Sequence, residues 1–181
     1  MVAMKLTSMI ALLSLALAGV VSAAEPAEKE KPHQPKPGSA ELERMKALAG
    51  TWKGKTDMGG GETEITVQYR IVSGGAAVEE RVFEGTPHEM VTMYYDKNGK
   101  LAMTHYCVLG NRPGLVLKSA DAKNLEFDFD ATCGVDDKTE MHMHSLAITF
   151  DGPDSMTQTW QLFDSGKPKE HHPFTLKRVK S

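Results

Sequence analysis

Apolar side chains recur at every second position along much of the chain after residue 50, which is the pattern of a strand with one buried face. In NLEFDFD, at 124–130, leucine and phenylalanine alternate with acidic residues, so Phe127 is expected to face inward. In SMTQTWQL, at 155–162, the same alternation places Gln158 and Trp160 on the inner face. The period of two therefore predicts a protein built mainly from strands.

Turn residues separate these runs at roughly ten-residue intervals. The predicted strands span about 51–57, 63–72, 76–84, 88–96, 100–108, 114–119, 124–131, 140–150, 155–163 and 169–178. The connections DKNGK, DGPDS and DSGK are typical of hairpins, and such short links require neighbouring strands to be antiparallel. A meander of about ten strands closes most simply into an up-and-down barrel, with a two-sheet sandwich as the alternative.

A clear helical period precedes the first predicted strand. Leu42, Met45 and Leu48 are spaced so that they share one face of a helix. Ser39 is a suitable N-cap, and Gly50 is a suitable stop. We therefore predict an all-β domain, a lipocalin-like antiparallel barrel of about ten strands preceded by one short helix.

The chain begins with a segment of a different kind. A lysine at position 5, an apolar run and small residues near position 24 are typical of a cleaved secretory signal, which we assign to 1–24. The next stretch, EPAEKEKPHQPKPGS, is rich in proline and charge and predicts a flexible linker at 25–38. The barrel domain then occupies 39–181. We expect an exported protein, periplasmic or extracellular, with no membrane span after processing.

Charge argues against one class of partner. The chain has 21 lysines and arginines and 24 aspartates and glutamates, a formal net charge of −3, and no dense basic stripe. Nucleic acids and anionic membrane surfaces require clustered positive charge. We therefore expect no nucleic-acid partner.

Two short motifs resemble parts of the lipocalin-like, or calycin, barrels. They are LAGTWKG at 48–54 and FTLKRVK at 174–180. In those families a Gly-x-Trp near the start of the first strand packs beneath the barrel against an arginine of the last strand. The matching residues here are Gly50, Trp52 and Arg178. Independently of the resemblance, an arginine at the end of an apolar strand face gains from stacking on an indole.

The wider sequence is similar to exported bacterial domains of unknown function within the same superfamily, through TPHEMVTMYY, THYCVLGNRPG and MHMHSLAITF. That similarity spans nearly the whole domain and implies a fold rather than an activity. A more distant likeness is to nitrobindin-like haem barrels, which share the Gly-x-Trp opening. Their glycine- and tyrosine-rich continuation is replaced here by KGKTDMGGGETEI.

The histidines indicate where a site would lie. If the predicted strands alternate in direction, every histidine of the domain falls toward the barrel end opposite Trp52. In EMHMHSLAITF, at 140–150, strict alternation gives the two histidines the same face as the apolar residues that follow. Few polar groups above an apolar interior are typical of small-molecule pockets. The predicted ligand-binding residues are His142, His144, Gln158, Trp160, His105 and Phe127.

Two other interpretations stand beside the pocket. A His-x-His pair on one strand also suits a metal or haem site, with His142 and His144 as its first ligands. His105, Cys107 and His172 are the candidates that would complete the shell. In the other interpretation the histidines are hydrogen-bonded rim residues without a ligand. The inner face of 100–108 stays open at this point, because that run is apolar on both sides.

An enzyme of unrecognised type is a third class of function. His88 lies beside Glu89, and Tyr94 and Tyr106 follow in the next predicted strands. These residue types can act as acids and bases, but the sequence gives no geometry that joins them.

Two cysteines, Cys107 and Cys133, are a candidate disulfide in an exported protein. One predicted strand separates their strands, which puts the backbones about 10 Å apart, whereas bonded cysteines have Cα atoms about 4.4–6.8 Å apart. A bond and free thiols are both left open.

Overall fold

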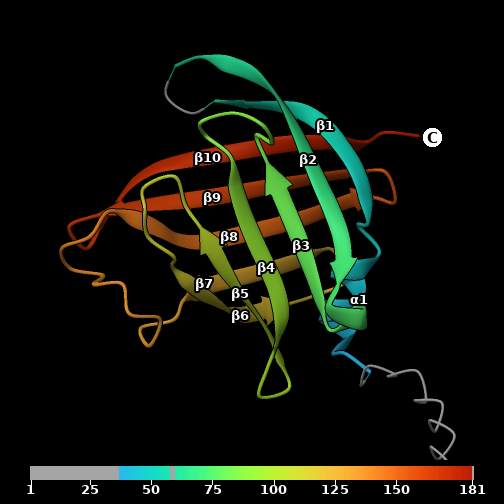
Figure 1. The fold of residues 1–181 in the computed structure, drawn as a ribbon, viewed down its shortest axis with the longest axis horizontal. Coiled ribbons are helices and arrows are strands. Elements are labelled where there is room, and N and C mark those ends of the chain that lie inside the picture. The colour runs from blue at the N-terminus through green and yellow to red at the C-terminus, as the bar shows by residue number, and fades with distance from the viewer. Residues whose placement is uncertain (1–36, 58–59, 181) are drawn as a thin grey trace, which may run out of the picture. The chain divides into compact units, whose positions relative to one another are not determined.

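Ten antiparallel strands close into one barrel in the part of the chain that the computed structural model describes, residues 37–57 and 60–180 (Figure 1). Each strand pairs with its neighbours along the chain, and the first strand also pairs with the last. The predicted all-β barrel is confirmed. The expected signal peptide and residues 25–36 of the expected linker lie outside the described residues. The strands are β1 (Gly50–Asp57), β2 (Glu62–Val72), β3 (Ala77–Val82), β4 (Met90–Lys97), β5 (Lys100–Tyr106), β6 (Gly114–Ala120), β7 (Asn124–Phe129), β8 (His142–Gly152), β9 (Ser155–Asp164) and β10 (Lys167–Arg178).

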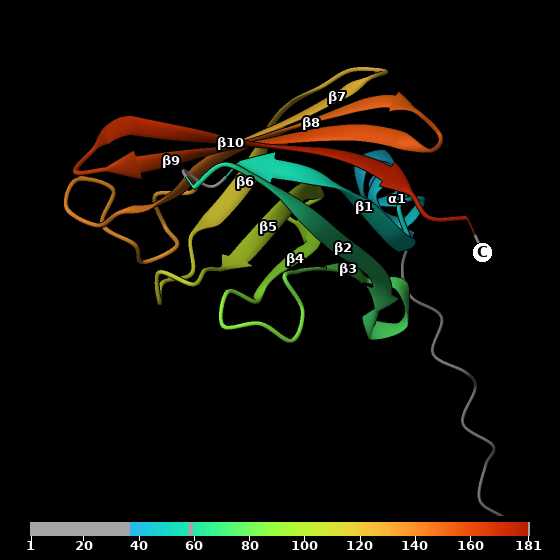
Figure 2. The same cartoon turned by 90° about the horizontal axis from the view of Figure 1, so that it is seen from above.

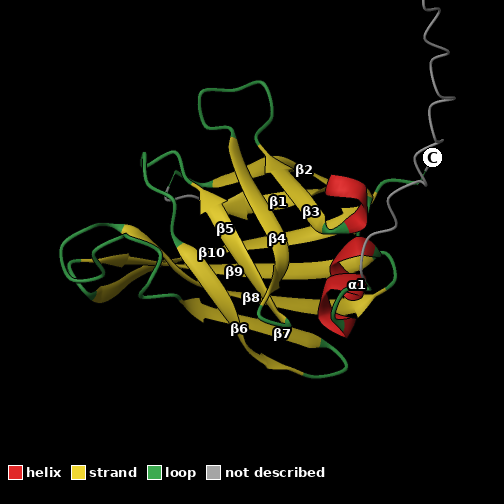
Figure 3. Ribbon diagram, turned by 60° about the horizontal axis from the view of Figure 1, so that its bottom comes forward, coloured by secondary structure: helices red, strands yellow, loops and turns green. Residues whose placement is uncertain are grey.

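The helix α1 (Ala40–Lys46) lies at one end of the barrel (Figure 3). It begins after Ser39, as predicted, and the Ser39 hydroxyl accepts a hydrogen bond from the backbone amide of Leu42 at 3.1 Å. Leu42, Met45 and the following Leu48 are at most 4% exposed and belong to the barrel core. The apolar face of α1 therefore extends the core beyond the strands.

Trp52 and Arg178 lie at the same end as α1. The Arg178 guanidinium stacks over the Trp52 ring, with its carbon 4.5 Å from the ring centroid. It also donates hydrogen bonds to the carbonyl oxygens of Ala47 and Ala49, at 2.7 and 2.8 Å. The indole N–H of Trp52 donates to the carbonyl of Leu48 at 2.8 Å. These contacts fasten the first and last strands to the residues that follow α1.

We call the opposite end of the barrel the distal end. Because the strands alternate in direction, the connections β1–β2, β3–β4, β5–β6, β7–β8 and β9–β10 all lie there. Figures 1 and 2 show the orange β7–β8 connection at the opposite end of the barrel from α1. The described histidines lie in these connections or in the strand segments that lead to them.

The start of β8 departs from the strict alternation expected for 140–150. The register of β8 against β9 shifts between Met143 and Ser145, because β8 carries an extra residue there. His142 pairs with Phe163, and Met143, which strict alternation would turn outward, is only 7% exposed. The two histidines therefore do not simply continue the inward face of the rest of the strand.

Candidate functional site

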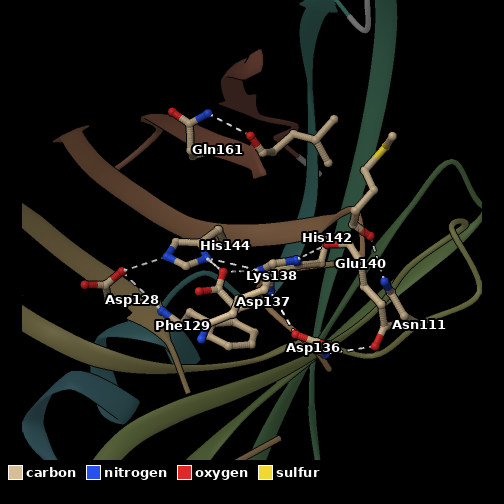
Figure 4. Close-up of polar contacts among 12 residues, drawn as sticks. Asn111, Asp128, Phe129, Asp136, Asp137, Lys138, Glu140, His142, His144 and Gln161 are labelled. Atoms are coloured by element: carbon tan, nitrogen blue, oxygen red, sulfur yellow. Dashed lines mark hydrogen bonds and ion pairs between the residues drawn. The ribbon is translucent and has the colours of Figure 1, made fainter. Parts of the chain in front are cut away.

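The predicted site residues fall into two groups rather than one. His142 and His144, at the start of β8, meet the side chain of Asp137 from the β7–β8 connection (Figure 4). We call these three residues the triad. The other group lies inside the barrel and contains His105, Gln158, Trp160 and Phe127.

Three atoms of the triad form a small triangle. The Nε2 atom of His142 lies 3.1 Å from Nδ1 of His144 and 3.5 Å from Oδ1 of Asp137. The third side, from His144 Nδ1 to Asp137 Oδ1, is 3.2 Å. Figure 4 shows the carboxylate between the two rings. Two imidazole nitrogens and a carboxylate oxygen therefore converge on one point.

His142 is held so that one particular nitrogen faces the triad. Its Nδ1–H donates to the backbone carbonyl of Glu140 at 2.8 Å, and a carbonyl oxygen can only accept. In the neutral ring the lone pair is then on Nε2, which points at His144 and Asp137. The His142 side chain is completely buried.

Aromatic rings fix the orientation of His144. Its imidazole stacks on Phe163, with centroids 3.7 Å apart and planes at 6°, and on Phe129 at 5.1 Å and 13°. Its Nε2 atom lies 3.8 Å from a carboxylate oxygen of Asp128. Burial lowers the pKa of His144, against the raising effect of Asp137. The ring is therefore favoured in its neutral form.

The β7–β8 connection that carries Asp137 is held by its own hydrogen bonds. The Asp136 carboxylate accepts from the Lys138 amide at 2.9 Å and from the Thr139 hydroxyl at 2.8 Å. The Glu140 carboxylate accepts from the Asp136 amide at 2.8 Å, and the Glu140 amide donates to the Asp136 carbonyl at 2.9 Å. Asp137 is left with its carboxylate directed at the two histidines.

The spacing of the histidine pair does not fit the two axial ligands of one haem iron. Axial ligands of a haem iron occupy opposite faces of the porphyrin, so two imidazole nitrogens would be about 4 Å apart on opposite sides of the metal. His142 Nε2 and His144 Nδ1 are 3.1 Å apart, with a carboxylate oxygen equally near. His142 and His144 therefore do not have the spacing of two axial ligands of one haem iron, and a haem held by only one of them stays a prediction.

Inside the barrel, four polar side chains form a row, one from each of β2 to β5. The strand register places each residue directly opposite the next. All four are at most 3% exposed, so His105 faces the interior, whereas Tyr106 is 51% exposed. We call this set the interior row, and it consists of Tyr69, Glu80, Thr92 and His105.

Glu80 is the centre of the hydrogen bonds in the interior. Its Oε2 atom accepts from the Tyr94 hydroxyl at 2.9 Å and from Nε2 of Gln158 at 2.7 Å. The Gln158 amide also donates to the Tyr69 hydroxyl and accepts from the indole N–H of Trp160 at 3.3 Å. Burial raises the pKa of the Glu80 carboxyl despite these hydrogen bonds. The amide nitrogen of Gln158 therefore already has hydrogen-bond acceptors in Glu80 and Tyr69.

His105 differs from the rest of the interior row because one of its nitrogens has no partner. Its Nδ1 atom is 2.9 Å from the Thr92 hydroxyl, and its ring centroid is 4.8 Å from that of Trp160. Its Nε2 atom is buried and makes no hydrogen bond. Burial lowers the pKa of His105 to about 4, which keeps the ring neutral at physiological pH.

The buried neutral state of His105 should make folding sensitive to acid. The unfolded chain takes up a proton near pH 6.5 and the folded protein only near pH 4, so stability is complete above pH 6.5 and falls as pH drops toward 4. The expected loss is up to about 3 kcal/mol. Urea unfolding between pH 7 and pH 4 measures this loss. The free energy of unfolding should fall less in His105→Gln than in the wild type, and the difference should be the contribution of His105. An identical pH dependence in both proteins would contradict a buried neutral His105.

The side chains one step nearer the distal end than Thr92, His105 and Trp160 are slightly less buried than the interior row. Met90 and Leu162 lie two positions from Thr92 and Trp160, toward the distal ends of β4 and β9. Cys107 lies two positions beyond His105, just past the distal end of β5. The three are buried but retain 4%, 8% and 9% exposure in that order. Met143, which pairs with Leu162, retains 7%. Unbranched methionine side chains adapt easily to a changed volume.

The residues considered for an enzyme are not assembled into one site. His88 is exposed. The Glu89 carboxylate accepts hydrogen bonds from the Arg81 side chain and from the Gly85 amide. Tyr94 donates to Glu80 inside the barrel, and Tyr106 is half exposed on the outside.

The two cysteines and the pair His171 and His172 lie outside the triad. Cys107 and Cys133 are free thiols in this structure, and burial raises the pKa of Cys107. His171 is exposed. His172 is 4% exposed, and its Nδ1 atom lies 3.4 Å from the carbonyl of Asp57. Neither of the two enters the triad.

Sequence reasoning missed Asp137 and Glu80, although each had a signal. Asp137 stands five residues before His142 in DDKTEMHMH, so the acid and the His-x-His pair are close along the chain. Glu80 lies between Val78 and Val82 at a period of two, which places a carboxyl on an apolar face. A charged residue on a buried face requires partners, and the structure supplies them.

The fold defines the class of this protein as a closed ten-stranded antiparallel β-barrel. A similar solved structure is the crystal structure of Rv2717c from M. tuberculosis, with a TM-score of 0.55 and 16% identity over 80% of this chain and 100% of that chain. At this identity the likeness shows the fold alone. The chain matches no protein-family model and no curated protein sequence. Within the described residues no helix has the length and apolar character needed to cross a bilayer.

Proposed function

We propose that this protein binds a small, partly apolar molecule carrying a hydroxyl group, at the distal end of the barrel against His105 and Trp160. The observation that carries the proposal is the Nε2 atom of His105, which is buried beside the Trp160 ring without a hydrogen-bond partner. Leaving such an atom unpaired costs about 1–3 kcal/mol, so a ligand atom that pairs with it gains affinity.

The tautomer of His105 explains the preference for a hydroxyl. Its Nδ1 atom shares a hydrogen bond with the Thr92 hydroxyl, in which either group can donate. If Thr92 donates, Nε2 of His105 carries the hydrogen and needs an acceptor; otherwise Nε2 needs a donor. A ligand hydroxyl serves in both cases, because it donates one hydrogen bond and accepts others.

Apolar side chains would form the rest of the proposed binding site. Trp160 offers its ring, and Met90 and Met143 offer flexible side chains that can shift to admit a ligand. Phe127, 1% exposed, belongs to the same hydrophobic core as Trp160 and Met90. Gln158 acts indirectly, since its hydrogen bond to the indole N–H helps to orient the ring.

We also propose that the barrel is of the lipocalin type and that the protein acts after export, in the periplasm or outside the cell. The stack of Arg178 on Trp52 supports the first proposal. Gly50 supports it too, because its φ of +125° favours glycine at that position of the motif. The signal-like pattern of residues 1–24 supports export.

Ligand binding should change the fluorescence of Trp160. The chain has two tryptophans, so Trp52→Phe leaves Trp160 as the single reporter. Titration with 1-octanol should give a saturable change in emission, because the alcohol would contact the ring and pair with His105. Adding His105→Phe and Thr92→Val removes both polar partners and should weaken binding about tenfold.

Two results of the octanol titration would contradict the proposed binding site. A non-saturable response in the Trp52→Phe protein, or equal affinity with and without the two interior changes, would refute the pocket. His171→Phe, a change at an exposed histidine, is the control and should leave octanol affinity unchanged. Native mass spectrometry of the protein purified from its own compartment should also show a bound small molecule.

A further inference from the structure

We propose that Asp137, His142 and His144 bind one divalent transition-metal ion of the zinc type, at a site separate from the binding site proposed against His105. Each residue contributes one atom, and the three atoms lie within 3.5 Å of one another. The inference does not depend on ligand binding against His105, because no hydrogen bond or ring contact found in the described residues joins the two groups.

The size of the triangle matches a tetrahedral ion. For metal–ligand bonds of about 2.0–2.1 Å, tetrahedral geometry separates neighbouring ligand atoms by about 3.3–3.4 Å. The three sides observed here are 3.1, 3.2 and 3.5 Å. Octahedral magnesium, with similar bond lengths, would bring neighbouring ligand atoms to about 2.8–3.0 Å.

The chemistry of the donors points to the same kind of ion. Two imidazole nitrogens and one carboxylate oxygen suit zinc and its neighbours, whereas calcium and magnesium are bound through oxygen. Three protein ligands leave a fourth position of a tetrahedral ion for water or another small ligand. The site therefore belongs to the open rather than the closed type of zinc site.

Burial and the surrounding contacts are independent support. His142 is completely buried, and Oδ1 of Asp137 is a buried atom without a hydrogen-bond partner. Behind the ligand atoms, the Glu140 carbonyl accepts from His142 Nδ1–H, and the Asp128 carboxylate lies 3.8 Å from His144 Nε2. Metal-binding histidines commonly donate a hydrogen bond from their second nitrogen, as His142 does here.

Zinc titration of matched variants tests the proposal. The full chain, purified without an affinity tag and stripped with a chelator, should take up about one Zn²⁺ per chain in competition with a chromogenic chelator. Asp137→Asn and His144→Gln should each weaken binding at least about a hundredfold, because changes behind the ligands alone cost about 10–100-fold. Asp151→Asn and His171→Gln, at exposed positions, are the controls and should retain the wild-type affinity.

Two outcomes would overturn the site. One is zinc affinity in Asp137→Asn and His144→Gln equal to that of the wild type, and the other is no stoichiometric zinc in the wild type. X-ray absorption at the zinc edge is a second measurement that needs no variant. It should show two imidazoles and oxygen ligands at about 2.0 Å, and a sulfur ligand would exclude the triad. Octanol binding at Trp160 should be unchanged in Asp137→Asn, so the two proposals can fail separately.

Discussion

Gly54→Ala should separate the first and last strands and lower the free energy of unfolding by more than about 3 kcal/mol. A Cβ atom at Gly54 would lie 1.8 Å from the carbonyl oxygen of Thr175 and 2.8 Å from its carbonyl carbon. Both atoms are backbone, so no side-chain rotation can relieve the clash. Gly54 pairs with Leu176 in the β1–β10 ladder, which closes the barrel.

Urea unfolding followed by circular dichroism measures the effect, and Gly60→Ala is the matched control. A Cβ atom at Gly60 meets nothing within 4 Å, and the backbone there is not in the left-handed region. Its replacement should be neutral or slightly stabilising, because alanine reduces the entropy of the unfolded chain. Equal stability of the two variants would show that β1 and β10 are not in close contact at Gly54.

Much of the fold follows from the sequence, because the barrel has one buried face and short connections. The alternation around Phe127 and the hairpin turns are local properties, and they fix strand number, direction and order. The exact ends of the strands are harder to predict from the sequence. The predicted strand 76–84 ends at Val82, because Phe83 adopts a positive φ of 56°. The predicted strand 100–108 ends at Tyr106, because Cys107 begins a turn closed by the amide of Gly110.

The candidate sites follow from the sequence only in part, because they depend on non-local contacts. The His-x-His pair was recognised, but its third partner lies in an irregular connection where no period indicates direction. The shift in register between Met143 and Ser145 depends on pairing with β9, which alternation within one strand does not reveal. The partners of Glu80 come from other strands, and Gln158 is 78 residues away along the chain.

Glu80→Leu should destabilise the barrel by about 4 kcal/mol, whereas Glu80→Gln should cost much less. Leucine would leave the Tyr94 hydroxyl and the Gln158 amide, both buried, without their acceptor, at about 1–3 kcal/mol for each unpaired donor. Glutamine keeps the shape of the side chain, and its amide oxygen can occupy the position of Oε2. Urea unfolding at one pH compares the three proteins.

The pH dependence of stability in the wild type and Glu80→Gln distinguishes the effect of ionisation at Glu80 from the effect of side-chain shape. Burial raises the pKa of Glu80 above its unfolded value, so the folded protein holds this proton more tightly than the unfolded chain. The corresponding stability is fully present below the unfolded pKa and is lost as pH rises through the folded pKa. Glu80→Gln has no such proton, so its stability relative to the wild type should increase from pH 4.5 toward pH 8. A constant difference across that range would mean that Glu80 titrates alike in the folded and unfolded chains. Burial in the interior row would then have no effect on its ionisation.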